Sequence, residues 1–380
     1  MLDNCPACSG STHALSLYRQ YDVPVQSCLL PSTEARARGV ERRQIELFGC
    51  RDCGLIFNRH FDATSQYFDT GYEETQGFSV VFQQFARDLG QNLDRRWHLS
   101  DRTVFEVGCG KGDFLAELCH RHGCRGVGID PAYDPQRRPR LAGDRVQYET
   151  RLFDDRDIGR RADYLVCRHT LEHIGPVAEF LGQVARFVRE GGVREVFFEV
   201  PEAGRILDEG AFWDIYYEHA NYFTAPALER AFTRAGFEVT GLARLFNDQY
   251  LGLFARLADR KPAPSQAVEP EHDTSRLAEN LDAWRRRLAE APTPIVVWGS
   301  GSKGVAFLHA ADPDRRVSEA VDINPYRQGR FMPGTGQTIL APEDLLGLNP
   351  QTVVVMNPAY RAEIRARLDA LGLHPRLMCV

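Results

Sequence analysis

The sequence predicts an α/β protein with two parallel β-sheet domains, and a repeated pattern supports this prediction. A buried strand runs into a glycine-rich turn and then into a helix at residues 104–113, and again at residues 295–304. After each helix a second strand ends at an aspartate, Asp130 in the first pattern and Asp322 in the second. This order of elements is typical of α/β domains that bind nucleotides.

The first turn has glycine at three alternate positions, Gly108, Gly110 and Gly112. Glycine lets the backbone approach a ligand closely and adopt dihedral angles that other residues avoid. Two carboxylates flank the turn, Glu106 before it and Asp113 after it. Because a helix N-terminus without such carboxylates favours phosphate, we expect this turn to bind a positively charged cofactor.

S-adenosylmethionine (SAM) fits these charges, because it carries an ammonium and a sulfonium and has no phosphate. Asp130 lies about 20 positions beyond the turn, where a carboxylate can accept hydrogen bonds from both ribose hydroxyls. The third glycine comes one residue too early for G-x-G-x-x-G, which disfavours NAD. These features resemble motifs I and II of class I methyltransferases, so we predict a class I (Rossmann-like) sheet that binds SAM. The alternative is a turn that serves packing alone.

The composition favours a protein with packed cores and a small-molecule substrate. The chain has 380 residues, of which 43% are hydrophobic, and a net charge of −6 at pH 7, which disfavours a nucleic-acid partner. It contains no run of 18 apolar residues, and its first residues do not resemble a signal peptide. We therefore expect a cytoplasmic protein without a membrane partner, as a monomer or homodimer.

Four of the ten cysteines form two Cys-x-x-Cys pairs, Cys5 with Cys8 and Cys50 with Cys53. Four thiolates at this local spacing complete a tetrahedral site with no open position, so we expect a structural Zn²⁺. The long interval between the pairs requires an inserted hairpin or helix. Packing cysteines without metal, or a regulatory module that binds nucleic acid, are the alternatives.

The chain is expected to divide into five segments. A helical pattern runs from Val80 to Trp97, and proline, charge and alanine dominate after Asp259. The segments are a zinc-binding module (1–60), a helical connector (61–99), a SAM-binding methyltransferase domain (100–258), a linker (259–274) and a C-terminal Rossmann-like domain that covers the substrate (275–380).

Two histidines, His169 and His173, follow the buried strand that begins near Ala162. Ligands of open parallel sheets lie beyond the carboxyl ends of the strands, so both histidines should lie near the methyl donor. We expect His169 to contact the cofactor, and a structural role is the alternative. Asp154 or Asp155 could face the adenine amino group.

The loop after the strand at 195–201 holds the densest polar and aromatic chemistry, including Tyr216, Glu218, His219 and Tyr222. A Glu–His pair between tyrosines can supply a general base and donors for a developing oxyanion. A buried polar network that fixes the loop is the alternative. Tyr72, in a Gly-Tyr-Glu-Glu turn, could point into a cleft, and we expect Tyr222 to contact substrate.

The second turn, from Gly299 to Gly304, matches G-x-G-x-x-G in full. Lys303, at the start of the following helix, suggests together with Gly301 a contact to a substrate diphosphate. Bound NAD, which would indicate an oxidoreductase, is the alternative, but this fingerprint alone is weak evidence.

The order of these parts resembles the NDP-deoxysugar C-methyltransferases, including the 3-C-methyltransferases of tetronitrose-type sugars, over nearly the whole chain. Residues 216–223 are similar to the family's Tyr-His-Glu-His-Phe-Ser-Tyr-Phe pattern. The resemblance implies that His219 is the base, with Tyr216 and Glu218 beside it, and that His173 and Tyr72 line the site. The chain departs from the pattern at 217, at 220–221 and at the Arg-His pair 168–169, which points to a different substrate within the superfamily.

The resemblance implies C-methylation of an NDP-4-keto-deoxysugar. His219 would remove a proton beside the ketone, and His173 or a tyrosine would stabilise the enolate before it attacks the methyl group. O- or N-methylation of a sugar or another small metabolite is one alternative. A zinc-dependent binding protein with a degenerate methyltransferase core is another, but Glu106, Asp130 and the three glycines argue against it.

Overall fold

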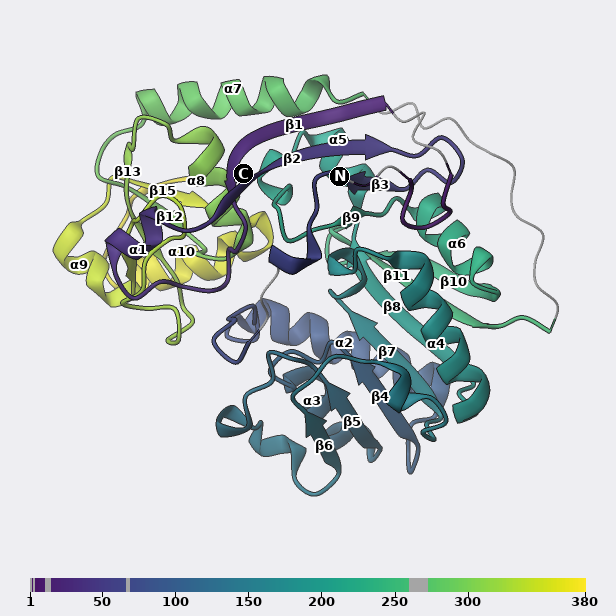
Figure 1. Cartoon of the computed structure of the whole chain (residues 1–380). Helices are drawn as coiled ribbons and strands as arrows, with labels where there is room; N and C mark the ends of the chain where they lie inside the picture. Colours follow the sequence, from purple (N-terminus) through teal and green to yellow (C-terminus); the bar gives the residue numbers. More distant parts are fainter. Residues whose placement is uncertain (1, 3, 11–14, 66–68, 260–272) are drawn as a thin grey trace.

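A computed structural model describes residues 2, 4–10, 15–65, 69–259 and 273–380, which form three β-sheets (Figure 1). The predicted linker lies almost entirely outside the described residues. Among the helices that the structure describes, none is long and apolar enough to span a membrane.

The central sheet has the strand order β10-β11-β8-β7-β4-β5-β6. Five neighbouring strands, β8, β7, β4, β5 and β6, are parallel, and the antiparallel pair β10 and β11 closes the other edge. The class I methyltransferase sheet is therefore confirmed. The strands are β4 (Thr103–Val107), β5 (Arg125–Ile129), β6 (Val146–Glu149), β7 (Tyr164–Arg168), β8 (Glu195–Pro201), β10 (Phe237–Leu245) and β11 (Tyr250–Leu257).

Helices cover both faces of this sheet, as expected for strands that are apolar along their whole length. Helix α4 shows why: its buried residues Val177, Leu181, Val184 and Val188 recur every three or four positions and form one apolar stripe. The predicted helix at 80–97 is confirmed at those bounds. The helices are α2 (Val80–Trp97), α3 (Asp113–His122), α4 (Val177–Gly191), α5 (Ala203–Glu209) and α6 (Ala225–Arg234).

The N-terminal sheet has the order β1-β2-β3-β9, and its last strand comes from the loop after β8. The segment between the cysteine pairs contains both a hairpin and a helix. The elements are β1 (Leu15–Pro24), α1 (Glu34–Arg38), β2 (Arg42–Gly49), β3 (Ile56–Asn58) and β9 (Asn221–Tyr222). Ile56 pairs with Tyr222 in antiparallel register, so residues 1–60 do not form a self-contained sheet.

The C-terminal domain has a fully parallel sheet in the order β14-β13-β12-β15-β16, which confirms the predicted second Rossmann-like domain. Its strands are β12 (Ile295–Trp298), β13 (Val317–Val321), β14 (Ile339–Leu340), β15 (Thr352–Val355) and β16 (Arg376–Cys379). Its helices are α7 (Ser275–Glu290), α8 (Ser302–Ala311), α9 (Leu345–Leu348) and α10 (Arg361–Ala370).

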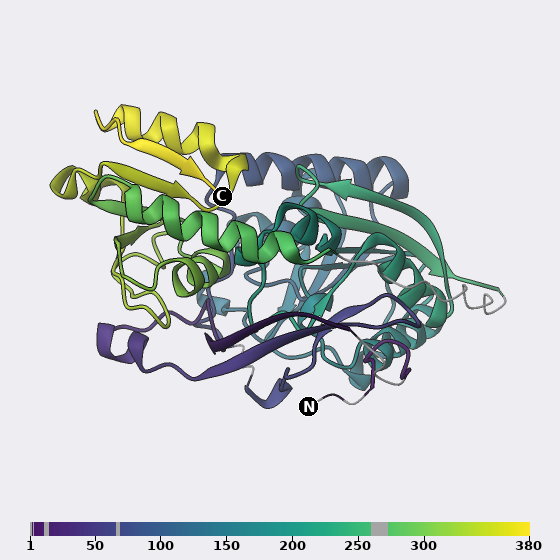
Figure 2. The same ribbon diagram turned by 90° about the horizontal axis from the view of Figure 1, so that it is seen from above.

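One hydrophobic core joins the N-terminal sheet, the loop after β8 and the C-terminal domain. It contains Ile45 of β2, Trp213 and Tyr217 of the loop, and Trp284 and Phe307 of the C-terminal domain. Both views show α7 running from the C-terminal domain toward the middle of the molecule, where it packs on α5 and on the short 3-10 helix η6 (Phe212–Asp214) (Figure 2). The loop after β8 is therefore held from two sides.

Candidate functional site

The central sheet and the C-terminal domain enclose a cavity of about 1490 Å³. It lies at the carboxyl ends of the parallel strands, where open α/β sheets bind their ligands. Most of the predicted site residues line it: Tyr72, Glu106, Gly108, Gly110, Asp130, His169, His173, Tyr216, His219, Gly301 and Lys303. Three others, Gly112, Glu218 and Tyr222, lie behind the cavity wall.

Tyr222 is a correction to the sequence analysis, which expected a substrate contact. Its side chain is buried in the hydrophobic core, and its hydroxyl donates to the Tyr216 carbonyl oxygen at 3.1 Å. Because β9 pairs with β3, Tyr222 supports the loop from behind instead of facing the cavity. The sequence offered no indication of that long-range pairing.

The expected adenine contact of Asp154 or Asp155 is also not supported, because neither residue lines the cavity. Asp154 pairs with Arg156 at 2.6 Å, and Asp155 accepts from Arg186 at 2.6 Å. Both carboxylates therefore form ion pairs at the surface.

The first glycine-rich turn has left-handed backbone conformations at Gly108, Gly110 and Gly112, with φ values of +73°, +53° and +86°. A side chain at any of these positions would strain the backbone. Asp130 fixes the turn, because its carboxylate accepts from the Gly110 amide at 2.9 Å and from the Ala132 amide at 2.7 Å. Each of its oxygens keeps a second lone pair for ribose hydroxyls.

Two carboxyl groups beside this turn each have one oxygen without a partner among the described residues. Glu106 is buried, Glu74 is half-buried, and the Oε2 atom of each makes no hydrogen bond within the described part of the chain. Burial raises the pKa of Glu106 to about 8 and that of Glu74 to about 7. A bound cation would satisfy both oxygens, so these residues fit the positively charged end of SAM. Sequence reasoning missed Glu74 as a site residue, although it is the last residue of the Gly-Tyr-Glu-Glu turn.

His169 and Arg168 share a carboxylate. Arg168 donates to Glu199 Oε1 at 2.9 Å, and His169 Nε2 lies 2.7 Å from the same oxygen. Burial alone would raise the pKa of Glu199, but Arg168 and His169 hold it below its ordinary value. The Arg-His departure from the family pattern therefore sets a guanidinium and an imidazole against one buried carboxylate, and His169 lines the cavity with its Nε2 beside Glu199.

His219 lines the cavity among aromatic rings. It is buried, with its ring 4.1 Å from that of Tyr216 and 4.9 Å from that of His173, centroid to centroid. Its Nδ1 has no hydrogen-bond partner among the residues described. Burial lowers its pKa well below the ordinary value, so the imidazole is neutral near pH 7 and able to accept a proton.

His173 is neutral for the same reason, since burial lowers its pKa to about 4. Its Nδ1 lies 2.9 Å from the Glu218 carbonyl oxygen and donates to it. The proton of the neutral ring is therefore on Nδ1, and Nε2 is an acceptor. This tautomer cannot donate to an enolate oxygen from Nε2, whereas the Tyr216 hydroxyl can.

Glu218 links its own loop to other parts of the chain and does not line the cavity. Its Oε1 accepts from the Tyr72 hydroxyl at 2.9 Å, and its Oε2 accepts from Ser27 of the N-terminal module. Ser27 in turn hydrogen-bonds Ser302 of the C-terminal domain at 2.6 Å. Burial raises the pKa of Glu218. The carboxyl of Glu218 therefore holds the loop, the module and the C-terminal domain together.

The departures of the loop from the family pattern lie away from the cavity. The Tyr217 hydroxyl donates to the His60 carbonyl oxygen at 2.9 Å and accepts from the Asp62 amide at 3.0 Å. The Asn221 amide donates to the Ile174 carbonyl oxygen at 2.7 Å. These two residues therefore fix the loop, and the loop residues that line the cavity, Tyr216 and His219, are ones that match the family pattern.

Lys303 lines the cavity from the C-terminal domain, but its ammonium is already paired. Its Nζ lies 2.8 Å from Asp214 Oδ1 and 3.2 Å from Gln249 Oε1. Burial lowers the pKa of Lys303, and Asp214 opposes this effect. Arg327, which sequence reasoning missed, lies next to Gly301 and donates to the Glu73 carbonyl oxygen. No local pattern distinguishes Arg327 from other loop arginines.

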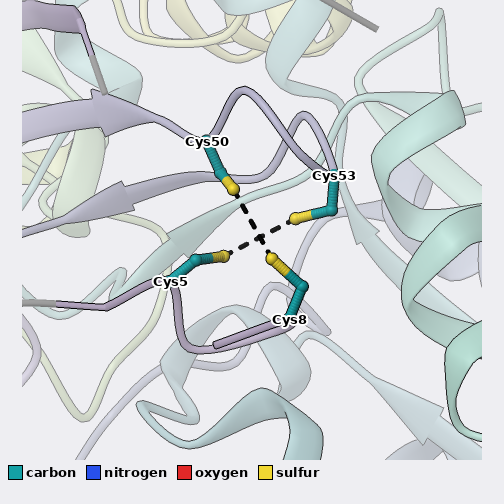
Figure 3. Close-up of side chains that lie close together, drawn as sticks. All are labelled: Cys5, Cys8, Cys50 and Cys53. Atoms are coloured by element: carbon teal, nitrogen blue, oxygen red, sulfur yellow. Dashed lines mark hydrogen bonds between the residues drawn. The ribbon is translucent and has the colours of Figure 1, made fainter. Parts of the chain in front are cut away.

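The four predicted metal ligands converge (Figure 3). Cys5 Sγ lies 3.5 Å from Cys53 Sγ, and Cys8 Sγ lies 3.6 Å from Cys50 Sγ. Four thiolates about 2.3 Å from a tetrahedral Zn²⁺ would be separated by about 3.8 Å, so the cluster has the size of a zinc site. The Gly10 amide donates to Cys8 Sγ at 3.4 Å, as expected for a thiolate ligand.

Two family models match the chain. Residues 81–242 match a methyltransferase domain, and residues 271–373 match a C-methyltransferase C-terminal domain. C-methyltransferase NovU from Streptomyces niveus is 24% identical over 96% of this chain and 91% of its own length. The ubiquinone biosynthesis O-methyltransferase of Serratia proteamaculans is 35% identical over 29% of this chain. That match spans 47% of the Serratia protein, about half of its length.

Solved structures match about half of this chain. Magnesium protoporphyrin IX methyltransferase from Synechocystis is 16% identical over 47% of this chain and 84% of its own, with a TM-score of 0.37. A Burkholderia thailandensis 1,6-didemethyltoxoflavin-N1-methyltransferase is 19% identical over 47% and 82% of the two chains, with a TM-score of 0.36. On the family models and the NovU alignment, the chain is a class I SAM-dependent methyltransferase in which the methyltransferase domain is followed by the C-terminal domain of the C-methyltransferases.

Proposed function

We propose that this enzyme methylates a carbon next to the ketone of an NDP-4-keto-deoxysugar. The observation that carries the proposal is His219, a buried neutral imidazole whose Nδ1 is unpartnered within the described chain and which shares a cavity with the first glycine-rich turn. A carbon acid needs such a base, whereas most heteroatom acceptors are more easily deprotonated. The alignment with a C-methyltransferase over nearly the whole chain supports the same choice.

His219 takes the proton from the carbon beside the ketone, and the electron pair of the broken C–H bond moves into the enolate. General base catalysis contributes about 10²- to 10⁴-fold, which is too little for a carbon acid. The Tyr216 hydroxyl, with its ring against that of His219, can donate to the enolate oxygen and add about 10²- to 10³-fold. We assign that role to Tyr216 instead of His173, because Nε2 of the neutral His173 ring carries no proton.

Bound SAM supplies an electrophilic methyl group. We assign Glu106 and Glu74 to its positive end and Asp130 to its ribose, because all three line the cavity. The C-terminal domain covers the opposite side of the cavity, where it can exclude water and hold enolate and methyl group in attack geometry. Gly301 and Lys303 are candidates for contacts to the nucleotide end of the sugar.

The test is mass spectrometry in heavy water with SAM and a panel of NDP-4-keto-deoxysugars. We expect a methyl gain on carbon, or deuterium beside the ketone. His219→Asn should slow both by about 10²- to 10⁴-fold and leave the Kd for SAM unchanged. His309→Asn is the matched control, because His309 lies outside the cavity and hydrogen-bonds the Tyr21 carbonyl oxygen.

Two outcomes contradict the proposal. Exchange that continues in His219→Asn would show that another group is the base. No methylation or exchange by a wild-type protein that binds SAM would indicate an oxygen or nitrogen acceptor.

We also propose that Cys5, Cys8, Cys50 and Cys53 hold one structural Zn²⁺. Elemental analysis should find one zinc per chain, and Cys50→Ser should lose it and melt at a lower temperature, because zinc binding stabilises the folded state. Cys379→Ser, a cysteine in β16, is the control and should keep both the metal and the melting temperature. A zinc-free protein with an unchanged melting curve would contradict this proposal.

A further inference from the structure

The cavity contains a buried carboxyl group that the proposed reaction does not use. Glu172 lies in the short 3-10 helix η5 (Leu171–His173) and is 1% exposed. Its Oε2 has no hydrogen-bond partner within the described ranges, and it faces the cavity. The His169 ring lies beside it, with Nδ1 3.8 Å from Glu172 Oε1 and Nε2 2.7 Å from Glu199 Oε1.

This carboxyl group lies close to the proposed base. A carboxylate oxygen of Glu172 and one ring nitrogen each of His173 and His219 all lie within 4.8 Å of one another. Both Glu172 and His219 have a buried polar atom without a partner in the described structure. Among the described residues no hydrogen bond joins Glu172 to His219, and the two side chains are close enough for a charge that develops on one to be stabilised by the other.

We propose that Glu172 is the positioning partner of His219 and stabilises the imidazolium that forms when His219 takes the substrate proton. The proposal rests on the proposed function. The proton moves from carbon to His219, the ionised Glu172 pairs with the resulting cation, and the proton leaves to water after methyl transfer. Glu172 acts through His219 and touches neither the methyl group nor the ketone.

The charges around Glu172 give this pair a defined pH dependence. Burial raises the pKa of Glu172 to about 8, and nearby Glu199 of β8 adds to the effect. The neighbouring titratable groups are Cys167 of β7 and His169 just after it, His173 on the same short helix as Glu172, and Tyr216 and His219 of the loop after β8. A carboxyl group with a raised pKa is protonated below it and ionised above it, so the supporting form of Glu172 becomes dominant above about pH 8.

The experiment compares the rate of deuterium exchange beside the ketone, and kcat and KM, across the pH range around 8 for the wild type and Glu172→Gln. We expect kcat and exchange in the wild type to rise through pH 8. In Glu172→Gln this rise should be absent, kcat should fall by about 10- to 100-fold, and KM should change little. Glu172→Asp should recover part of the rise. Glu179→Gln, at an exposed position of α4, is the matched control.

The outcomes separate this inference from the proposed function. An exchange rate and pH profile of Glu172→Gln that match the wild type would overturn the role of Glu172 while the function stands. Absence of exchange in the wild type would overturn the proposed function itself. Loss of wild-type activity on chelation, with recovery on added Mg²⁺ or Mn²⁺, would show that the three side chains hold a metal and would also overturn the pairing. Unchanged SAM affinity and melting temperature in Glu172→Gln would exclude misfolding.

Discussion

The two glycine-rich turns use the same backbone device but differ in what surrounds them. In each, an aspartate at the end of the next strand accepts a backbone amide of the turn: Asp130 from Gly110 and Asp322 from Ser300, both at 2.9 Å. Around the first turn, Glu106 and Glu74 have carboxyl oxygens without partners in the described chain. Around the second, Ser300 donates to Asp322, and Lys303 and Arg327 both have hydrogen-bond partners.

This contrast indicates that a glycine pattern identifies a fold, whereas buried side-chain atoms without hydrogen-bond partners indicate a ligand site. The second turn matches G-x-G-x-x-G more fully, yet Lys303 is paired with Asp214 and Arg327 donates to Glu73. The first turn matches this fingerprint less well, but the carboxyl oxygens without partners lie beside it. The cofactor site is therefore better recognised from buried carboxylates than from glycine spacing.

The comparison predicts its largest effect at Gly108. A Cβ there would lie 2.8 Å from Thr170 Cβ, and the residue has φ +73°. Gly108→Ala should weaken SAM binding by about 100-fold, through backbone strain and overpacking. Calorimetric titration with SAM measures it.

The matched variant in the second turn is Gly301→Ala. Gly301 has φ −77°, and a Cβ would lie 3.3 Å from the end of the Arg327 side chain, so SAM affinity should be nearly unchanged. Equal losses of SAM affinity in the two variants would contradict the assignment of the cofactor to the first turn.

A smaller effect is expected at Glu106. Glu106→Gln removes one charged partner of the cofactor and should weaken SAM binding by about 10- to 100-fold. Because the pKa of Glu106 is about 8 in the empty enzyme, binding of a cation below that pH must release a proton. The affinity of the wild type should therefore rise with pH up to about 8 and then level off.

Titrations in buffers with different ionisation enthalpies would detect this proton release. Glu106→Gln should release fewer protons. If Glu106→Gln keeps the full pH dependence of SAM affinity, the proton is released by another group, and Glu74 is the next candidate.

The smallest effect on the cofactor is expected at Ser300. Its buried hydroxyl donates to Asp322 at 2.6 Å, so Ser300→Ala should lower the free energy of unfolding by about 1–3 kcal/mol. SAM affinity should change by less than about 0.5 kcal/mol, as for independent sites. Denaturant unfolding and calorimetry measure the two quantities, and a large loss of SAM affinity would show that the second turn also serves the cofactor.

Features encoded in consecutive residues could be predicted from the sequence. The helix at 80–97 and the strand at 195–201 match the structure at both ends, because their apolar periodicity and flanking residues are local. The spacing within each cysteine pair is also local. The convergence of Tyr72, His173 and His219 was expected from the resemblance and from the rule that ligands lie at strand ends.

Features that depend on long-range packing could not be predicted. The buried position of Tyr222 follows from pairing with Ile56, which lies far away in the sequence. Glu172 precedes a predicted histidine, but nothing in the sequence says that its carboxyl group is buried and unpaired. Arg327 reaches the cavity only because Glu73 lies beside it in the folded chain.

The pairing of β3 with β9 has a consequence for how the chain is made. During synthesis β3 emerges long before β9, so one edge of the N-terminal sheet stays open until the whole parallel core has been translated. An open strand edge can pair with other chains. The cysteine cluster, which needs only the first 53 residues, can close much earlier and hold β2 and β3 in register. The metal would then act as a chaperone for the nascent chain as well as a clamp on the finished enzyme.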